Sequence, residues 1–183
     1  MDRKSGKTVR TPRAIVAILM GSESDLPTMV ECARVLESYG LAYEVRVLSA
    51  HRSPDAALRY VRGAERRGIR VIVAGAGGSA HLAGMAAAHT QLPVIGVPLA
   101  GSPLGGVDAL LSTVQMPPGV PVATVGVGTM GAANAAHLAT SIMALSDPAL
   151  RAKLDARRAK MRDDVLAKAA DVPRKLRELI DGK

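Results

Sequence analysis

Short apolar runs alternate with helical segments along this 183-residue chain, and this alternation limits the folds open to it. The run Ala14–Met20 has the length and continuous apolar character of a strand that is buried on both faces. We expect four more strands, at Tyr43–Leu48, Val71–Ala74, Val94–Val97 and Val122–Val125. Strands that alternate with helices form parallel sheets with right-handed crossovers. The pattern therefore predicts an α/β protein with a central parallel sheet between two helical layers.

The segments between these strands carry helix signals. We expect helices at Leu26–Tyr39, closed by Gly40, and at Pro54–Arg67, closed by Gly68. Further helices are expected in the alanine-rich segment after the third strand, at Ala132–Leu145, and from Asp147-Pro148 to about Ala170. The length fits one α/β domain over residues 14–170, including this C-terminal helix. Residues 1–13 are then a basic N-terminal extension and residues 171–183 a C-terminal extension.

The formal charge of +8 is concentrated at the two ends of the chain. Residues 1–13 carry five basic side chains and one acidic one, and residues 147–183 carry eleven basic and seven acidic ones. The region between them has no net charge. A nucleic-acid-binding domain would carry its basic surface on the fold itself. The distribution therefore argues against a nucleic-acid partner.

The stretch from Val71 to Ser146 contains one charged side chain, Asp108. A monomer of this size needs more charge on its outer surface. Burial in a sheet and then in a subunit interface accounts for such a stretch. We therefore predict a homo-oligomer.

Cysteine content and hydropathy indicate the compartment. Cys32 is the only cysteine, which excludes an intrachain disulfide and favours a reducing compartment, and its apolar neighbours favour a core position. No apolar run is long enough to span a bilayer, and the N-terminus lacks the pattern of a signal peptide. We expect a cytoplasmic protein without a membrane partner.

Polar residues follow the first predicted strand, where ligands of open parallel sheets bind. Ser22, Ser24 and Asp25 lie at the start of a helix, where free N–H groups favour anions. Ser24 or Asp25 capping the helix is an equally good interpretation of this loop alone. No Gly-Lys-Ser/Thr sequence follows, which argues against a nucleoside triphosphate.

The loop after the second strand holds Ser49, His51 and Arg52. An arginine beside a helix start can bind a phosphate through two parallel hydrogen bonds. A neighbouring histidine can exchange a proton near neutral pH. The alternative is a capping histidine beside a solvated arginine. The position at a sheet edge favours the functional interpretation.

The third such loop is glycine-rich, running from Gly75 through Gly77 and Gly78 to His81. Its backbone can approach a flat ligand closely. His81 either faces the same cleft or caps the next helix. The histidines and Cys32 lack zinc-type spacing, and acidic residues near the loops are too few for magnesium, so we expect no metal.

In order and spacing, the motifs of this chain resemble those of the N5-carboxyaminoimidazole ribonucleotide mutases, the class I carboxylating enzymes of bacterial purine synthesis. The matching segments are residues 20–25 (MGSESD), 49–55 (SAHRSPD), 74–82 (AGAGGSAHL), 92–98 (LPVIGVP), 106–108 (GVD), 114–117 (VQMP) and 131–136 (GAANAA). They cover the chain from about Ala14 to Leu145. Two departures are Leu26, where tryptophan is frequent, and Ala83, where proline is usual.

The resemblance implies a flavodoxin-like fold, an octamer and the conversion of N5-carboxyaminoimidazole ribonucleotide to 4-carboxy-5-aminoimidazole ribonucleotide. It implies that His51 is the general acid/base. It also implies that the reaction needs no cofactor. By the resemblance, Ser22, Asp25 and Arg52 hold the ribose phosphate, while Ser49 and the Gly77 loop line the site. We add Ser24 and His81 to the predicted substrate-binding residues. The substrate would come from the ATP-dependent carboxyaminoimidazole ribonucleotide synthetase, with a possible direct hand-off.

Two other functions compete with the mutase. Class II enzymes of the same fold carboxylate aminoimidazole ribonucleotide directly with CO2, but carry serine and asparagine after the glycine, where this chain has Gly77-Gly78-Ser79-Ala80. A catalytically silent nucleotide-binding module, whose basic ends recruit an acidic partner, is the third possibility. It predicts that binding survives His51→Asn and that function fails when the ends of the chain are removed.

Overall fold

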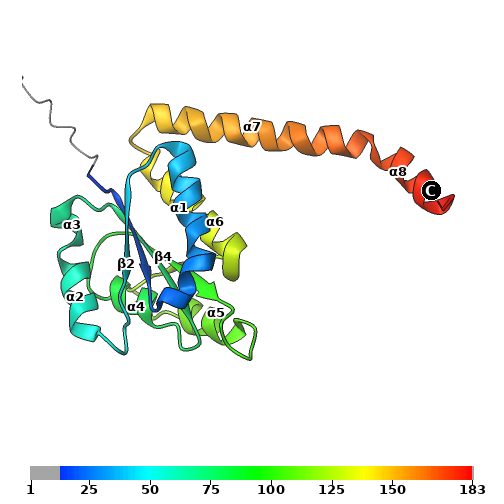
Figure 1. The fold of residues 1–183 in the computed structure, drawn as a ribbon. Helices are drawn as coiled ribbons and strands as arrows, with labels where there is room; N and C mark the ends of the chain where they lie inside the picture. The colour runs from blue at the N-terminus through cyan, green and yellow to red at the C-terminus, as the bar shows by residue number, and fades with distance from the viewer. Residues whose placement is uncertain (1–12, 183) are drawn as a thin grey trace, which may run out of the picture. The chain divides into compact units, whose positions relative to one another are not determined.

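The computed structural model describes residues 13–182 and contains a five-stranded sheet (Figure 1). All strands are parallel, in the order β2-β1-β3-β4-β5. The strands are β1 (Val16–Met20), β2 (Tyr43–Val47), β3 (Val71–Gly77), β4 (Val94–Leu99) and β5 (Ala123–Thr124). Every residue of β1 is buried, as the continuous apolar run predicts for a strand flanked on both sides.

Eight α-helices and one short 3-10 helix connect and follow the strands within the described residues. They are η1 (Glu23–Asp25), α1 (Leu26–Tyr39), α2 (Pro54–Arg62), α3 (Ala64–Arg67), α4 (Leu82–Ala87), α5 (Val107–Val114), α6 (Gly128–Met143), α7 (Pro148–Ala170) and α8 (Val172–Ile180). None of these helices is long and apolar enough to cross a membrane. By its internal contacts the chain divides into two compact units, one ending at Ala139 and the other beginning at Thr140. We call residues 13–139 the body and residues 147–182 the arm.

Alternate side chains of the central strands point to opposite helical layers. On one face, Ala17, Leu19 and Ile72 pack in a core cluster with residues of α2, α3 and α4. On the other face lies α1, and the hydroxyl of Tyr39 at its end contacts Nδ1 of His137 on α6 at 3.1 Å. The predicted three-layer α/β/α sandwich is confirmed.

Several predicted element ends are also confirmed. Gly40 and Gly68 close their helices in the left-handed conformation, with φ of 74° and 99°. Asp147 caps α7 and Pro148 opens it, and α7 ends at Ala170 as expected. Cys32 is fully buried in α1, as its apolar neighbours predict.

Other expectations need correction. The helix predicted over residues 54–67 is interrupted at Gly63, whose missing side chain lowers the helix propensity there. The third strand continues beyond Ala74 to Gly77, because the glycines pair with β4 as far as Leu99. Helix α5 was not predicted: its exposed face carries Val107 and Leu111, so no polar face marks it as amphipathic.

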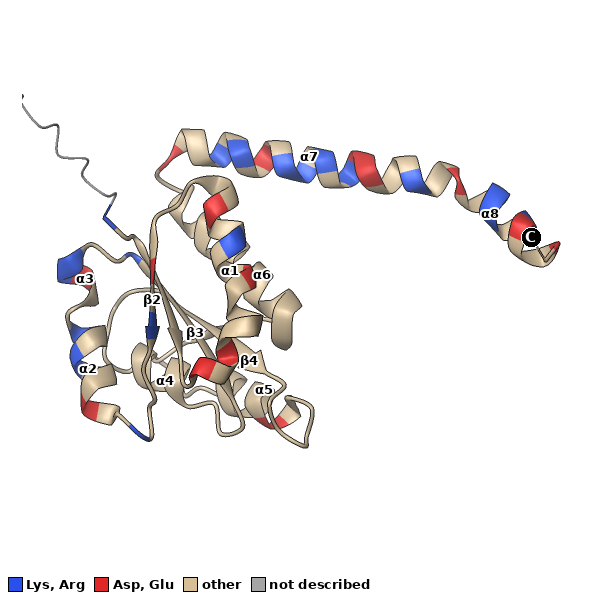
Figure 2. Ribbon diagram, viewed as in Figure 1, with Lys and Arg blue, Asp and Glu red and all other residues tan. Residues whose placement is uncertain are grey.

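The expected extensions have different outcomes. Residues 1–12 of the basic N-terminal extension lie outside the described residues. Residues 172–180 of the C-terminal extension form α8, which follows α7 after a single residue, Asp171. Among the described residues, charged side chains gather on α2, α3 and the arm, while β3, β4 and α4 carry none (Figure 2).

Candidate active site

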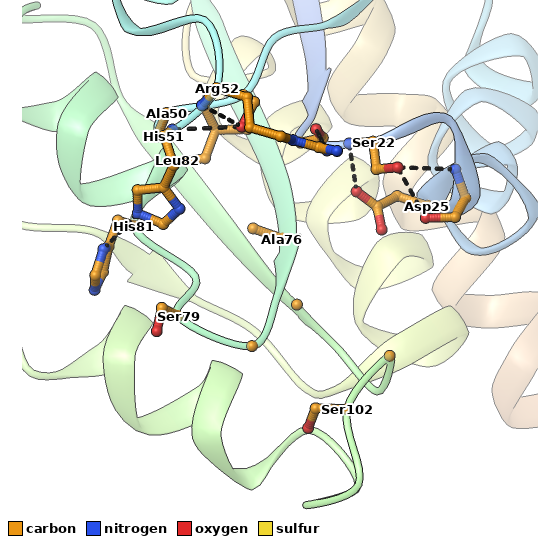
Figure 3. Close-up of a pocket in the computed structure, with 16 residues that line it drawn as sticks. Ser22, Asp25, Ala50, His51, Arg52, Ala76, Ser79, His81, Leu82 and Ser102 are labelled. Carbon is orange, nitrogen blue, oxygen red and sulfur yellow. Dashed lines mark hydrogen bonds between the residues drawn. The ribbon is translucent and has the colours of Figure 1, made fainter.

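One pocket of about 430 Å³ lies at the carboxyl ends of β1, β2, β3 and β4 (Figure 3). This is the edge of a parallel sheet at which ligands bind, and the volume suits a small molecule. All eight predicted site residues line it: Ser22, Ser24, Asp25, Ser49, His51, Arg52, Gly77 and His81. The structure thus brings together residues from three loops that are distant in the sequence.

The loop after β1 is held by a reciprocal capping arrangement. The Ser22 N–H donates to Asp25 Oδ2 at 2.9 Å, and Ser22 Oγ accepts from the Ser24 N–H at 3.4 Å and contacts Ser24 Oγ at 3.0 Å. Ser22 is therefore the cap, and it caps η1. The alternative in which Ser24 or Asp25 caps the longer helix is wrong, since Asp25 precedes α1 without a side-chain capping bond.

Opposing effects act on the pKa of the half-buried carboxyl group of Asp25. Desolvation raises its pKa above the usual value and outweighs the lowering by backbone hydrogen bonds from Ser22 and Gly21 and by the charge of Arg52. The carboxylate is thus held close to a cation without full solvation. A bound anion near Arg52 would share that cation with Asp25.

The loop after β2 is organised by Ser49. Its Oγ accepts hydrogen bonds from the backbone N–H groups of His51 at 3.4 Å and Arg52 at 3.1 Å, and its own N–H donates to Ser53 Oγ at 3.0 Å. Arg52 Nη2 donates to the carbonyl oxygen of Gly21 at 2.9 Å. Figure 3 shows the Arg52 side chain extending from this loop towards Ser22 and Asp25. The guanidinium therefore ties the second loop to the first and keeps further N–H donors at the pocket.

The histidine rings meet at another part of the pocket. His51 Nε2 and His81 Nδ1 are 2.8 Å apart, and the rings pack edge to face with centroids 5.0 Å apart. One of these nitrogens must donate and the other accept, so the contact fixes the tautomers relative to each other. His81 stands at the start of α4 without capping it through its side chain, which excludes the capping interpretation.

The glycine loop after β3 forms the floor between these groups. A Cβ at Gly77 would lie 3.3 Å from the carbonyl oxygen of Leu99, and Gly78 has a φ of +60°. Ser112 on α5 supports this loop, since its Oγ accepts from the Ala80 N–H at 3.1 Å and contacts the Gly78 carbonyl oxygen at 3.2 Å. A side chain at position 77 would therefore crowd the Leu99 carbonyl oxygen, and Gly78 adopts a conformation that favours glycine.

The sequence did not predict that a fourth loop contributes to the pocket. Gly101 and Ser102, from the loop after β4, also line the pocket. Their position after a fourth strand at the same sheet edge was the available signal. The support from Ser112 had no signal, because α5 was not predicted. No three His, Cys, Asp or Glu side chains within residues 13–182 gather as metal ligands, so these residues offer no built metal site.

Comparison with known proteins gives a consistent result. A family model described as AIR carboxylase matches residues 15–164. The N5-carboxyaminoimidazole ribonucleotide mutase of Pyrococcus abyssi is 57% identical over 139 residues, covering 76% of this chain and 79% of that protein. The protein of the same name from Mycobacterium tuberculosis is 52% identical over 162 residues, covering 88% of this chain and 92% of that one.

A solved structure supports the fold. The crystal structure of Treponema denticola PurE superposes with a TM-score of 0.77 at 25% identity, covering 87% of this chain and 98% of that chain. The motifs, the site and the matches over most of the chain agree. The chain therefore belongs to the AIR carboxylase family of enzymes.

Proposed function

We propose that this protein is a mutase of purine biosynthesis that converts N5-carboxyaminoimidazole ribonucleotide to 4-carboxy-5-aminoimidazole ribonucleotide. The observation that carries the proposal is the pocket itself, in which the guanidinium of Arg52 and the imidazole of His51 line one cavity. A ribonucleotide carries a phosphate for the first group and a reacting ring for the second. The names of the relatives support the same reaction.

The phosphate is assigned to the Arg52 side of the pocket. Arg52 has N–H groups beyond the one that donates to Gly21, and Ser22 and Ser24 line the same pocket. Charge-assisted hydrogen bonds from a guanidinium suit a phosphate. Asp25 orients this loop through the Ser22 N–H, and Ser49 orients the loop that carries Arg52.

The imidazole ring of the substrate is assigned to the glycine floor. Within the described residues the pocket lining contains no Phe, Tyr or Trp, so no stacking platform is offered. Gly77 instead lets the backbone approach a flat ring closely. His81 closes the same end of the pocket through its contact with His51.

The reaction requires one proton to be delivered and one to be removed. Protonation of the carbamate nitrogen breaks the N–C bond and releases CO2, leaving aminoimidazole ribonucleotide. The electron-rich ring carbon C4 then attacks the trapped CO2, and loss of the C4 proton restores aromaticity. A neutral imidazole can take that proton, and His51 is the proposed acid/base. The pocket contributes proximity, and the proton balance needs no cofactor.

Direct carboxylation of aminoimidazole ribonucleotide by CO2 is the second candidate. It shares the attack of C4 on CO2 and would use the same residues. The relatives that are more than 50% identical are named mutases, which favours the first candidate. The two differ in whether the carbamate is a substrate.

A homo-octamer is part of the proposal. The body exposes large apolar side chains on a region almost free of charge, among them Leu104, Val107, Leu111 and Met130. Burial of such a patch between subunits is favourable. We also propose a cytoplasmic location. A direct hand-off from the ATP-dependent synthetase would protect the carbamate substrate, which is labile.

The test supplies N5-carboxyaminoimidazole ribonucleotide and follows C4 carboxylation without ATP or metal. We expect turnover by the wild type and a loss of roughly 100- to 10,000-fold in kcat for His51→Asn. His89→Asn is the matched control, because the His89 ring bonds the Met85 carbonyl oxygen within its own helical segment. Full activity of His51→Asn would overturn the acid/base assignment. Turnover of aminoimidazole ribonucleotide with bicarbonate, together with no turnover of the carbamate, would instead establish the class II reaction.

A further inference from the structure

Ser112 of α5 contacts the glycine loop without lining the pocket itself. Its Oγ accepts at 3.1 Å from the N–H of Ala80, which lies 32 residues earlier in the sequence. Ala80 is buried, so water cannot replace this acceptor. Without the Ser112 oxygen, the Ala80 N–H would lose its partner unless the loop moved, and an unpaired buried donor is costly. The hydroxyl of Ser112 therefore ties the loop to α5.

The Ser112 oxygen is itself fixed by the backbone of α5. Its hydroxyl has one proton and lies within reach of three carbonyl oxygens, those of Asp108 at 2.6 Å, Gly78 at 3.2 Å and Ala109 at 3.4 Å. The shortest of these contacts, to Asp108 one turn earlier, directs the proton into the helix. A hydroxyl that donates in this way is a better acceptor for the Ala80 N–H. Helix α5 thus offers the loop an oxygen whose position is set by the helix.

The loop that Ser112 holds has little regular structure of its own. Residues 78–81 lie between the end of β3 and the start of α4 and belong to neither element. Gly78 has a φ of +60°, and a glycine lets the chain adopt many conformations. The pairing of β3 with β4 ends at Gly77. The position of this loop therefore depends on contacts with other elements, among them the contact with Ser112.

The peptide that Ser112 holds directly precedes His81. The His81 N–H donates to the Ser79 carbonyl oxygen at 2.8 Å, and the His81 carbonyl oxygen accepts from the Met85 N–H at 2.9 Å. The backbone of His81 is thus held on both sides, and its Nδ1 lies 2.8 Å from Nε2 of His51. A hydrogen bond of this kind requires a donor on one ring and an acceptor on the other. A shift of the peptide before His81 would therefore disturb the proton arrangement of His51.

Thr113, the next residue of α5, provides a comparison within the same helix. Its Oγ1 donates to the Ala109 carbonyl oxygen at 2.7 Å, one turn earlier, and the side chain is buried. This bond stays within α5. Ser112 and Thr113 thus share a bond to their own helix, but Ser112 also reaches the glycine loop. Removing each hydroxyl in turn separates the effect of the loop contact from the effect of the helix bond.

We propose that Ser112 is a positioning residue of the active site. By holding the Ala80 peptide, it places His81 so that the two imidazoles keep complementary tautomers. His51 then presents one defined proton state to the substrate, as general acid/base catalysis requires. The consequence for turnover rests on the proposed acid/base role of His51, whereas the effect on the two rings does not.

Imidazole NMR of the full-length protein without substrate tests the effect on the rings. The chain has four histidines, so isotope-labelled histidine gives a small set of ring signals that single substitutions can assign. We expect Ser112→Ala to shift the ring nitrogen signals of His51 and His81 and to mix their tautomers. Thr113→Val is the matched control, because it removes the neighbouring hydroxyl and should leave both rings unchanged. The ring of His137, which contacts Tyr39 on another helix, should be unchanged in both variants.

Turnover of the proposed carbamate substrate tests the consequence for catalysis. We expect Ser112→Ala to lower kcat by roughly 10- to 100-fold, because a small misplacement of a catalytic group has an effect of this size. KM should change by less than about threefold, because the phosphate is assigned to Arg52 on a different loop. Ser112→Thr and Ser112→Val have nearly the same shape, but only threonine keeps the oxygen. Ser112→Thr should therefore have the higher kcat.

Four results would overturn the proposal. Unchanged ring signals of His51 and His81 in Ser112→Ala would show that Ser112 does not position them. Equal changes in Thr113→Val would show that the loop contact has no special effect, and changes that reach His137 would show a general loss of packing. Equal kcat values for Ser112→Thr and Ser112→Val would show that the oxygen has no role in turnover.

The two measurements also separate this proposal from the proposed function. If the wild type does not turn over the carbamate while the ring signals respond to Ser112→Ala and not to Thr113→Val, the proposed reaction is wrong and the positioning by Ser112 is supported.

Discussion

The body and the arm place the same kinds of side chain in opposite environments. In the body, Leu19 and Ile72 are fully buried between a sheet and its helices. In the arm, Leu166 and Leu176 are 61% and 56% exposed, and salt bridges three or four residues apart run along the helix. Burial of apolar area therefore stabilises the body, whereas local interactions stabilise the isolated arm.

Matched leucine substitutions give the largest contrast between the two regions. Leu19→Ala opens a cavity in the core of the body and should lower the free energy of unfolding by about 2–5 kcal/mol. Leu166→Ala, at an exposed position of the arm, should change it by no more than about 0.5 kcal/mol. Urea denaturation of the two variants measures both values. Equal losses would show that the arm is folded into the same cooperative core.

Thiol reactivity gives the next contrast. Burial raises the pKa of Cys32 to about 12, so little thiolate forms near neutral pH and access is closed. A cysteine at the exposed position Ala167 has neither restriction. We expect it to react with a thiol reagent at pH 8 at least about 100-fold faster than Cys32. The rates converge in denaturant if burial is the cause, and a fast reaction of Cys32 in the native protein would contradict this.

The helix cap of the arm should have a smaller effect, confined to the arm. Asp147 Oδ1 accepts hydrogen bonds from the N–H groups of Ala149 and Leu150, both at 3.0 Å. Asp147→Ala should cost about 1 kcal/mol of helix stability, seen as faster amide exchange in the first turn of α7. Asp147→Asn keeps an acceptor and serves as the control. Faster exchange in α1 or β1 would show that the effect reaches the body.

The smallest effects on stability should come from neutralising one carboxylate in each region, Asp25 in the body and Asp164 in the arm. The two effects should have opposite signs. Desolvation raises the pKa of Asp25 in the folded state, so its contribution to stability is favourable at low pH and is lost as pH rises through the folded-state pKa. The stability of Asp25→Asn relative to wild type should therefore increase between about pH 3 and pH 6. Asp164→Asn removes an exposed pair with Lys160 and should cost a few tenths of a kcal/mol, less at high salt.

The reliability of the sequence predictions differs along the chain for physical reasons. The alternation of short strand-like runs with helical segments identified all five strands, and Gly40 and Gly68 marked helix ends because only glycine adopts their conformation freely. Helix α5 escaped prediction because its exposed face is apolar.

The sequence by itself determined the succession of strands and most helices along the chain, the parallel sheet and three of the loops that line the site. These depend on local patterns of apolar, polar and glycine residues. Only the tertiary structure decided the contact of His51 with His81, the reach of Arg52 to Gly21 and the contribution of Ser102. Such contacts join segments 30 or so residues apart, and their distances follow from how the strands pair and how side chains are oriented at the sheet edge.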